Sequence, residues 1–277
     1  MLKKRWLKIT VITISVILVV LLTLMGVLHL FQYKVTHINN PFVPKDEYKK
    51  VELTPETDLK TIFLQTGICQ NTAKKMIKDG RFDEILKAQE DFFANDEVIC
   101  RSLIDWLTRE DRLKNIKYDF YDLQPGDILV TLSTHSLGWR HGHCAIVVDK
   151  FSVVESISLG VNSSEESIYF WKDYPTVAVL RVKNKTFSER EAVAKFAAEK
   201  LIDKPYSIFA GFGSEKAVDI NGDLVLHCSY LPWYAWQYFG VDLDSDGGPL
   251  VTSDDILNSD KVEIIQIYGM DPREFLN

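Results

Sequence analysis

The segment HCSYLPWYAW, residues 227–236, combines a cysteine, a helix-start signal and an aromatic-rich run. Pro232 has no backbone N–H and therefore suits the first turn of a helix, which predicts a start near Ser229, a good N-cap residue. Cys228 then lies at the helix N-terminus, where unpaired N–H groups and the positive end of the helix dipole favour a thiolate. The alternative is that Cys228 is a small hydrophobic residue used only for packing.

Short strands surround this segment and predict an α+β domain. A Pro-Gly turn at 125–126 leads into a strand at 128–132, and residues 143–148 and 151–157 predict a hairpin. Further strands are expected at 177–182 and 262–267, with a helix from Ser188 to about Leu201 and a turn at Asn221-Gly222. Antiparallel strands with two embedded helices are typical of the α+β class.

The N-terminal region predicts a transmembrane helix. Residues 9–31 read ITVITISVILVVLLTLMGVLHLF, without a charged side chain. At about 1.5 Å per residue this run spans a hydrocarbon core of about 30 Å. Residues 1–8 are basic, so the positive-inside rule puts the N-terminus in the cytoplasm and the rest of the chain outside the membrane. A cleaved signal peptide is the alternative, but the run is long and offers no small-x-small cleavage site. We expect a single-pass protein of the cell membrane.

The charge balance and the linear pattern suggest the remaining organisation. The net charge of the chain is −7, and the first 34 residues carry five basic and no acidic side chains, so the remainder is strongly acidic. An acidic body argues against nucleic acid as a partner. Residues 34–53 are polar with two prolines and predict a linker, residues 54–117 predict a small helical subdomain, and residues 118–277 predict the main domain.

His143 is the best candidate for a base acting on Cys228. It opens a strand on which Ala145 and Val147 share its face, a small apolar surface suited to a packed helix. If residues 149–151 form a three-residue loop, Val148 pairs with Ser152, and Glu155 lies diagonal to His143 within reach of a long side chain. A carboxylate beside the imidazole would fix its tautomer. A register slip of one residue would turn Glu155 to the other face.

The ordered motifs LQPGDILV, GHCAIVVD, VVES, DKPYS and HCSYLPWYAW, followed by FGVDL, resemble a known group over roughly residues 120–270. The group is the YiiX-like, permuted papain-like branch of the NlpC-type cysteine hydrolases. The resemblance implies a papain-like fold, a small antiparallel barrel with the nucleophile's helix packed on it. It also implies that Cys228 is the nucleophile, His143 the base and Glu155 the orienting acid, and it places Tyr206 near the site as a substrate-binding residue.

Other residues offer alternatives that the sequence leaves open. His141 and His143 could be metal ligands, but no further ligand stands at a familiar spacing. His227 is the second choice as base, and His135 or Arg140 could bind a substrate carboxylate. The run Asp242-x-Asp244-x-Asp246-Gly247 resembles half of a calcium loop but lacks the glutamate at position twelve. Cys69 and Cys100 are either a disulfide or two free thiols.

These observations predict a membrane-anchored, extracytoplasmic cysteine hydrolase, a thiol-dependent amidase or peptidase. We expect amide substrates, with peptidoglycan stem peptides as the leading candidate by resemblance, and a chemistry that needs no metal or organic cofactor. Two alternatives remain. One is a non-catalytic module that binds cell wall or lipid on the same fold, and the other is a lipid-directed thioesterase or acyltransferase.

Overall fold

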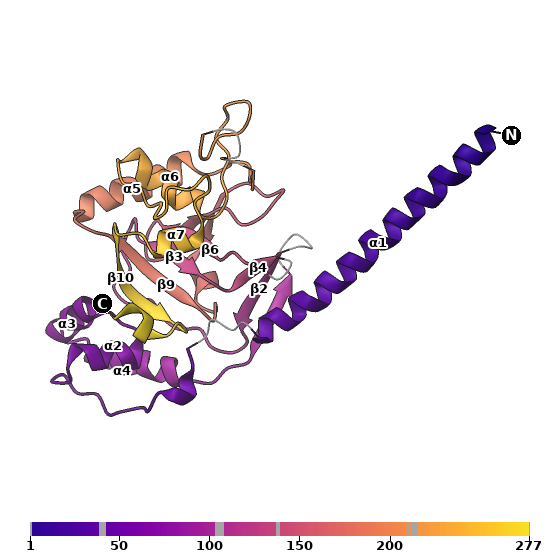
Figure 1. Cartoon of the computed structure of the whole chain (residues 1–277). Coiled ribbons are helices and arrows are strands. Elements are labelled where there is room, and N and C mark those ends of the chain that lie inside the picture. The colour runs from indigo at the N-terminus through magenta and orange to yellow at the C-terminus, as the bar shows by residue number, and fades with distance from the viewer. Residues whose placement is uncertain are drawn as a thin grey trace. The chain divides into compact units, whose positions relative to one another are not determined.

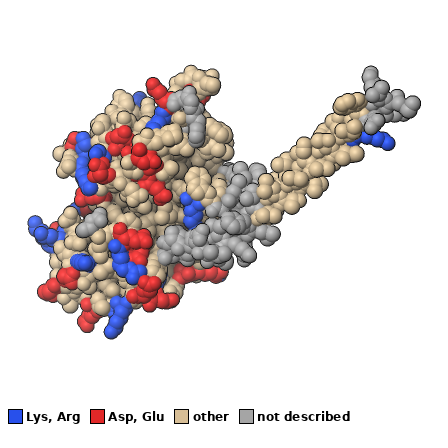
Figure 2. Space-filling view, viewed as in Figure 1, with Lys and Arg blue, Asp and Glu red and all other residues tan. Residues whose placement is uncertain are grey.

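The computed structural model describes residues 2–38, 43–102, 108–136, 139–209, 211 and 215–276. The chain divides into one unit of residues 1–40 with 136–139 and a second unit of the remaining residues. Helix α1 spans Leu2–Ile38. Within it, Lys8–Val27 has a mean hydropathy of 2.7 and is long and apolar enough to cross a bilayer. This finding rests on length and composition, criteria that a signal sequence also meets, and Figure 2 shows the middle of α1 as an uncharged surface.

The second unit contains a six-stranded antiparallel sheet. Its strand order is β10-β9-β3-β6-β7-β8. In chain order the strands are β3 (Ile128–Thr131), β6 (His143–Val147), β7 (Ser152–Glu155), β8 (Ser164–Ser167), β9 (Val177–Val182) and β10 (Val262–Tyr268). A four-stranded sheet follows the order β1-β2-β4-β5, with β1 (Val98–Ser102), β2 (Thr108–Leu113), β4 (Thr134–Ser136) and β5 (Trp139–Arg140). The α+β class is therefore confirmed.

The predicted closed barrel is wrong, because both sheets are open over the described residues. The outer edge of β10 is occupied by the chain that links two N-terminal helices. Cys69 N–H donates to Ile265 O at 3.1 Å, and Ile267 N–H donates to Gly67 O at 2.8 Å. Gly67 has a φ of +72°, and a Cβ there would lie 2.1 Å from Ile267 O. This close approach covers the edge that a barrel would have used to close on β8.

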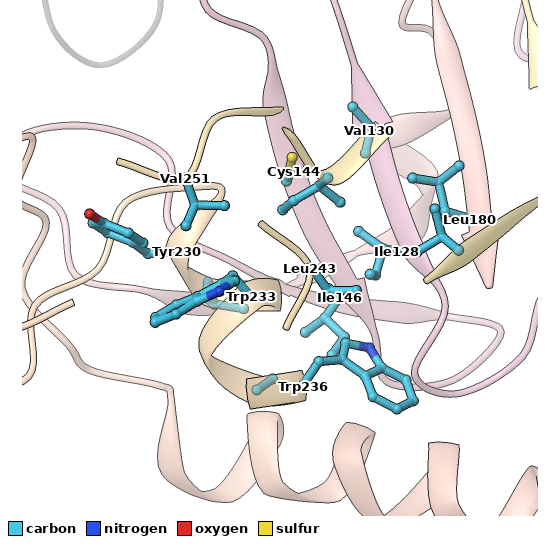
Figure 3. Close-up of a cluster of buried hydrophobic side chains, with 14 of the residues drawn as sticks. Ile128, Val130, Cys144, Ile146, Leu180, Tyr230, Trp233, Trp236, Leu243 and Val251 are labelled. Atoms are coloured by element: carbon cyan, nitrogen blue, oxygen red, sulfur yellow. The ribbon is translucent and has the colours of Figure 1, made fainter. Parts of the chain in front are cut away.

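Three helices cover one face of the six-stranded sheet (Figure 1). They are α5 (Phe187–Lys200), α6 (Tyr230–Tyr238) and α7 (Ser253–Leu257). Alternate strand residues, including Val130, Cys144 and Ile146, form a buried cluster with the α6 aromatics, as Figure 3 shows. The opposite face packs against a second cluster that contains Trp171 and Tyr174. Helix α5 begins after Thr186, which forms a capping box with Glu189, rather than at Ser188 as predicted.

The segment predicted as a helical subdomain is helical only in its first part. Helices α2 (Leu59–Thr66), α3 (Gln70–Lys78) and α4 (Phe82–Phe93) are followed by β1 and β2. These two strands pair in register, so that each supplies the hydrogen bonds the other needs. Short 3₁₀ turns lie at Lys45–Glu47, Ile168–Trp171 (η2) and Pro272–Phe275. Residues 39–42 of the predicted linker and 103–107 of the predicted helical segment lie outside the described residues.

Candidate active site

Cys228 lies at the start of α6, as the sequence predicted. Leu231 N–H donates to His227 O at 3.1 Å, so α-helical hydrogen bonding begins with the carbonyl just before Cys228. Ser229 is the N-cap by backbone position, but its side chain makes no capping bond. Instead, Tyr230 N–H donates to Nδ1 of His227 at 3.4 Å. The thiol of Cys228 is buried at 7% exposure and faces the positive end of the helix dipole.

His143 is the first residue of β6 and is held at the point where the strand begins. Its strand partner is Thr131, the last residue of β3. The preceding Gly142 has a φ of +71°, and a Cβ there would lie 2.8 Å from Ser253 Cβ and 2.8 Å from Thr131 O. A side chain at residue 142 would therefore push α7 away from β3. The glycine allows the chain to turn into β6 with the imidazole next to Cys228.

Glu155 reaches His143 through the strand register that the sequence predicted. Val148 N–H donates to Ser152 O at 3.0 Å, and Ala145 is paired with Glu155, which confirms the three-residue loop and the diagonal position of Glu155. Nε2 of His143 lies 2.9 Å from Oε2 of Glu155. Since Glu155 holds Nε2, Nδ1 is the nitrogen left to face the thiol. The interaction with Cys228 favours the charged form of this imidazole.

We expected the nucleophile's helix to pack on the face of β6 that carries His143. This expectation is wrong. Helix α6 packs on the opposite face, against Cys144 and Ile146, whereas Ala145 and Val147 belong to the cluster of Trp171 and Tyr174. The reason is geometric: the nucleophile sits at the helix terminus, so only that terminus has to reach the end of β6. The packed helix itself is present, on the other side of the sheet.

Trp171, on the 3₁₀ turn η2, is a site residue that the sequence analysis missed. Its indole Nε1–H donates to Oε2 of Glu155 at 2.9 Å. Its ring stacks on the His143 imidazole, with centroids 5.2 Å apart and planes 19° from parallel. The indole therefore fixes both the carboxylate and the imidazole. A buried tryptophan usually finds an acceptor for its N–H, but no local pattern around residue 171 indicates which one.

The electrostatics of the site favour a thiolate–imidazolium pair. Burial opposes charge on His143, yet its hydrogen bonds and charge interactions with Cys228 and Glu155 raise its pKa to about 10. Burial would likewise raise the pKa of Cys228, but His143 and His227 hold it well below the ordinary thiol value. Burial also opposes the Glu155 carboxylate, whose pKa is nevertheless lowered by His143, Trp171 and Arg112. The three groups stabilise one another in their charged forms.

Two further histidines lie near the thiol. His227 helps to lower the pKa of Cys228, and its Nδ1 accepts a hydrogen bond from the backbone N–H of Tyr230. His141 is half-buried, and burial lowers its pKa although Cys228 acts in the opposite direction. Its Nδ1 lies 2.8 Å from Gly142 O. His143 is fixed by the Glu155 carboxylate, so it remains the better candidate for the base.

Tyr206 is brought next to the nucleophile segment through the backbone. It forms a parallel bridge with Leu226, and Ser207 N–H donates to Leu226 O at 2.9 Å. Leu226 is two residues before Cys228, so the half-buried Tyr206 lies beside the strand-like entry to α6. Its role in substrate binding stays a prediction.

The other acidic and basic candidates are engaged within the protein. His135 Nε2 lies 3.3 Å from Oδ1 of Asp111, and Arg140 Nη2 donates to Oδ2 of the same carboxylate at 2.9 Å, so neither residue is set up to bind a substrate carboxylate. In the calcium-like run, Asp242 accepts from Trp233 Nε1 at 2.8 Å, and Asp244 is paired with Lys216. Lys216 already neutralises the negative charge of Asp244. No disulfide joins Cys69 and Cys100, or any other pair of cysteines among the described residues.

Comparison with known proteins yields one structural likeness. No protein-family model matches the chain, and no curated protein matches it. Among solved structures, the chain resembles the crystal structure of metalloprotein yiiX from Escherichia coli O157:H7, DUF1105. The two share 15% sequence identity at a TM-score of 0.38, over 52% of this chain and 97% of that one. The resemblance to YiiX is confirmed; a likeness at this level says nothing of activity, and the NlpC-type assignment stays a prediction.

Proposed function

We propose that this protein is a cysteine hydrolase that cleaves an amide bond, with Cys228 as nucleophile, His143 as general base and acid, and Glu155 as the orienting acid. The observation that carries the proposal is one buried imidazole set between a buried carboxylate and a thiol. Nε2 is fixed by a buried carboxylate at 2.9 Å, and the other nitrogen is left to the thiol at a helix N-terminus. A nucleophile, a base and an orienting group arranged in this way are what a catalytic triad requires, and this supports the proposal.

The reaction would proceed in two steps. The Cys228 thiolate attacks the carbonyl carbon of the amide, and the His143 imidazolium gives its proton to the leaving amine, which leaves a thioester on Cys228. The neutral imidazole then takes a proton from water as the hydroxide attacks the thioester. The acid product leaves, and the thiolate–imidazolium pair is restored. Throughout, Glu155 and Trp171 hold the imidazole in one orientation.

The helix start also offers a site for the oxyanion. Tyr230 N–H donates to His227 Nδ1, and Leu231 N–H donates to His227 O. Among the described residues, the N–H groups of Cys228 and Ser229 make no hydrogen bond and stand at the positive end of α6. Donors of this kind stabilise the negative charge that develops on the carbonyl oxygen.

We further propose that the substrate lies outside the cytoplasm. The apolar segment of α1 would anchor the chain, and the basic residues before it would keep the N-terminus inside, so the site would face the cell wall. Peptidoglycan stem peptides are our leading candidate because they present amide bonds at that location. The sequence resemblance points to the same substrate class.

The four thiols of the full-length chain allow a test with internal controls. We would alkylate the detergent-solubilised protein with iodoacetamide from pH 5 to 9 and quantify each cysteine by mass spectrometry. Unperturbed thiols react appreciably only near a pH of about 8.5. We expect the buried Cys228 to react well below neutrality, and faster there than the more accessible Cys69. The same protein would then be incubated with muropeptides.

A His143→Ala variant provides the control. We expect it to shift the reactivity of Cys228 to higher pH and to abolish release of amine from muropeptides, with the profiles of Cys69 and Cys100 unchanged. If Cys228 in the wild-type chain reacted only at the pH of an ordinary thiol, or if its profile were indifferent to His143→Ala, the hydrolase proposal would be wrong. A non-catalytic binding module would then be the better account.

A further inference from the structure

A second cluster of potential ligands lies in the four-stranded sheet, away from Cys228. Cys100 on β1, Asp111 on β2 and His135 on β4 come from three neighbouring strands with β2 in the middle. Cys100 and Asp111 are direct cross-strand partners, so their side chains share a face. Sγ of Cys100, Oδ1 or Oδ2 of Asp111 and a ring nitrogen of His135 all lie within 4.8 Å of one another.

The geometry of this cluster differs from that of a catalytic triad. In the proposed triad, the carboxylate holds Nε2 of His143 and leaves the other nitrogen to the thiol. In the second cluster, both groups approach the same nitrogen: Nε2 of His135 lies 4.0 Å from Sγ of Cys100 and 3.3 Å from Oδ1 of Asp111. A proton relay through the imidazole therefore cannot connect them. Ligands around a metal ion are arranged in this way, with a sulfur, a nitrogen and an oxygen pointing toward a common centre.

The distances and donor types fit zinc. With Zn–S near 2.3 Å and Zn–N or Zn–O near 2.05 Å, a tetrahedral angle places nitrogen and oxygen about 3.3 Å apart and sulfur and nitrogen about 3.6 Å apart. The first separation is already 3.3 Å, and the second needs to close from 4.0 Å by a few tenths of an ångström. Cys100 is exposed, so it can move by that much, and it gives an ion access from solvent. A thiolate, an imidazole and a carboxylate together suit Zn²⁺ better than Mg²⁺ or Ca²⁺.

The surroundings support a fixed carboxylate ligand. Arg140 donates to Oδ2 of Asp111 at 2.9 Å and to Leu132 O at 3.1 Å, which orients the carboxylate and leaves Oδ1 directed at His135. Asp111 and His135 are both fully buried. Outer partners of this kind hold metal ligands in place and tune their affinity. No local spacing in the sequence indicates this set, because Cys100 and His135 lie 35 positions apart.

We propose that Cys100, Asp111 and His135 bind one Zn²⁺ ion, separately from the Cys228 site. Three protein ligands leave the fourth tetrahedral position to water or to another ligand. The ion would link β1 and β4 to the central strand β2. The chain would then hold a zinc centre alongside a nucleophilic thiol that does not require it.

The test uses full-length protein in detergent and reductant, first stripped of metal with a chelator. Because Cys228 lies among histidines and could bind metal itself, every measurement is made in a Cys228→Ser background. Co²⁺ alone is titrated, and the thiolate-to-cobalt charge-transfer band is followed, then Zn²⁺ is added to displace it. Cys100→Ser removes the proposed thiolate ligand at an exposed position, and Cys69→Ser is the matched control at the other accessible thiol.

We expect a thiolate–cobalt band that saturates at about one ion per chain in the background protein and in the Cys69→Ser variant, and its loss in Cys100→Ser. Arg140→Gln should keep the band but weaken binding about 10- to 100-fold, the usual effect of removing an outer partner. Melting without metal checks that Cys100→Ser remains folded. Absence of the band in the background protein, or its persistence in Cys100→Ser, would overturn the proposal.

Discussion

Replacing Glu155 with glutamine isolates the electrostatic part of the proposed triad. The amide keeps an oxygen that can accept from Nε2 of His143 and has nearly the same volume, so the change removes charge rather than shape. In the wild-type chain, Cys228 and Glu155 together raise the pKa of His143 from 6.5 to about 10 against burial. An opposite charge in contact typically shifts a pKa by about 1–3 units, so Glu155→Gln should lower the pKa of His143 by that order, or roughly 1–4 kcal/mol at about 1.36 kcal/mol per pKa unit.

The consequence can be read at the thiol. A less basic imidazole takes the proton of Cys228 less readily, so the equilibrium constant for forming the thiolate–imidazolium pair should fall roughly 10- to 1,000-fold. The alkylation rate of Cys228 in full-length protein should then begin to rise at a higher pH than in the wild type. Amide hydrolysis at neutral pH should slow by a comparable factor. The melting temperature at neutral pH is recorded to confirm that the variant is folded.

A neighbouring carboxylate supplies the matched control. Glu165 lies on β8, is exposed and pairs with Val154, the residue before Glu155. Glu165→Gln removes one negative charge from the same part of the sheet without touching His143, and its alkylation profile should match the wild type. If Glu155→Gln also matched the wild type, the assignment of Glu155 as the group that charges His143 would be refuted.

Three further outcomes follow from the site. Trp171→Phe keeps the stack on His143 but removes the N–H donated to Glu155. Chemical denaturation should show that the free energy of unfolding falls by about 1–3 kcal/mol, and Cys228 should alkylate more slowly below neutrality. A denaturation midpoint equal to that of the wild type would contradict this prediction. Gly142→Ala should lower the free energy of unfolding by more than about 1 kcal/mol, because residue 142 has a positive φ and the new Cβ would meet Ser253 and Thr131. Gly80→Ala, which also has a positive φ but open space around it, should lower it less. Equal losses in the two variants would argue against a steric contact at residue 142. The Cys228–His143 pair should give a melting-temperature difference between the wild type and the double variant Cys228→Ala/His143→Ala that is level between about pH 6.5 and 9, where folded and unfolded pairs each hold one proton. Below pH 6.5 the unfolded histidine binds a second proton and stability falls; above pH 9 the unfolded cysteine loses its proton while folded His143 keeps one until about pH 10, and stability falls again. A difference that changes steadily across the middle range would exclude the charged pair.

Local sequence signals were sufficient for the elements that carry the proposed triad. Pro232 and the aromatic run predicted where α6 begins, because proline is restricted to the first turn. The spacing of the β6–β7 hairpin predicted that Glu155 would lie diagonal to His143, because strand register follows from loop length. The apolar run at the N-terminus predicted a helix long enough for a bilayer, and α1 contains it. The α+β class followed in the same way from strand and helix patterns.

The tertiary structure alone decided what lies around these elements. The link between α2 and α3 covers β10, so the sheet stays open where a barrel was expected. The η2 turn brings Trp171 onto His143 and Glu155, and three strands of a separate sheet bring Cys100, Asp111 and His135 to one point. Each of these contacts joins residues distant in the chain. Their partners are chosen by packing and by the need to satisfy buried polar groups, which no local pattern of residues encodes.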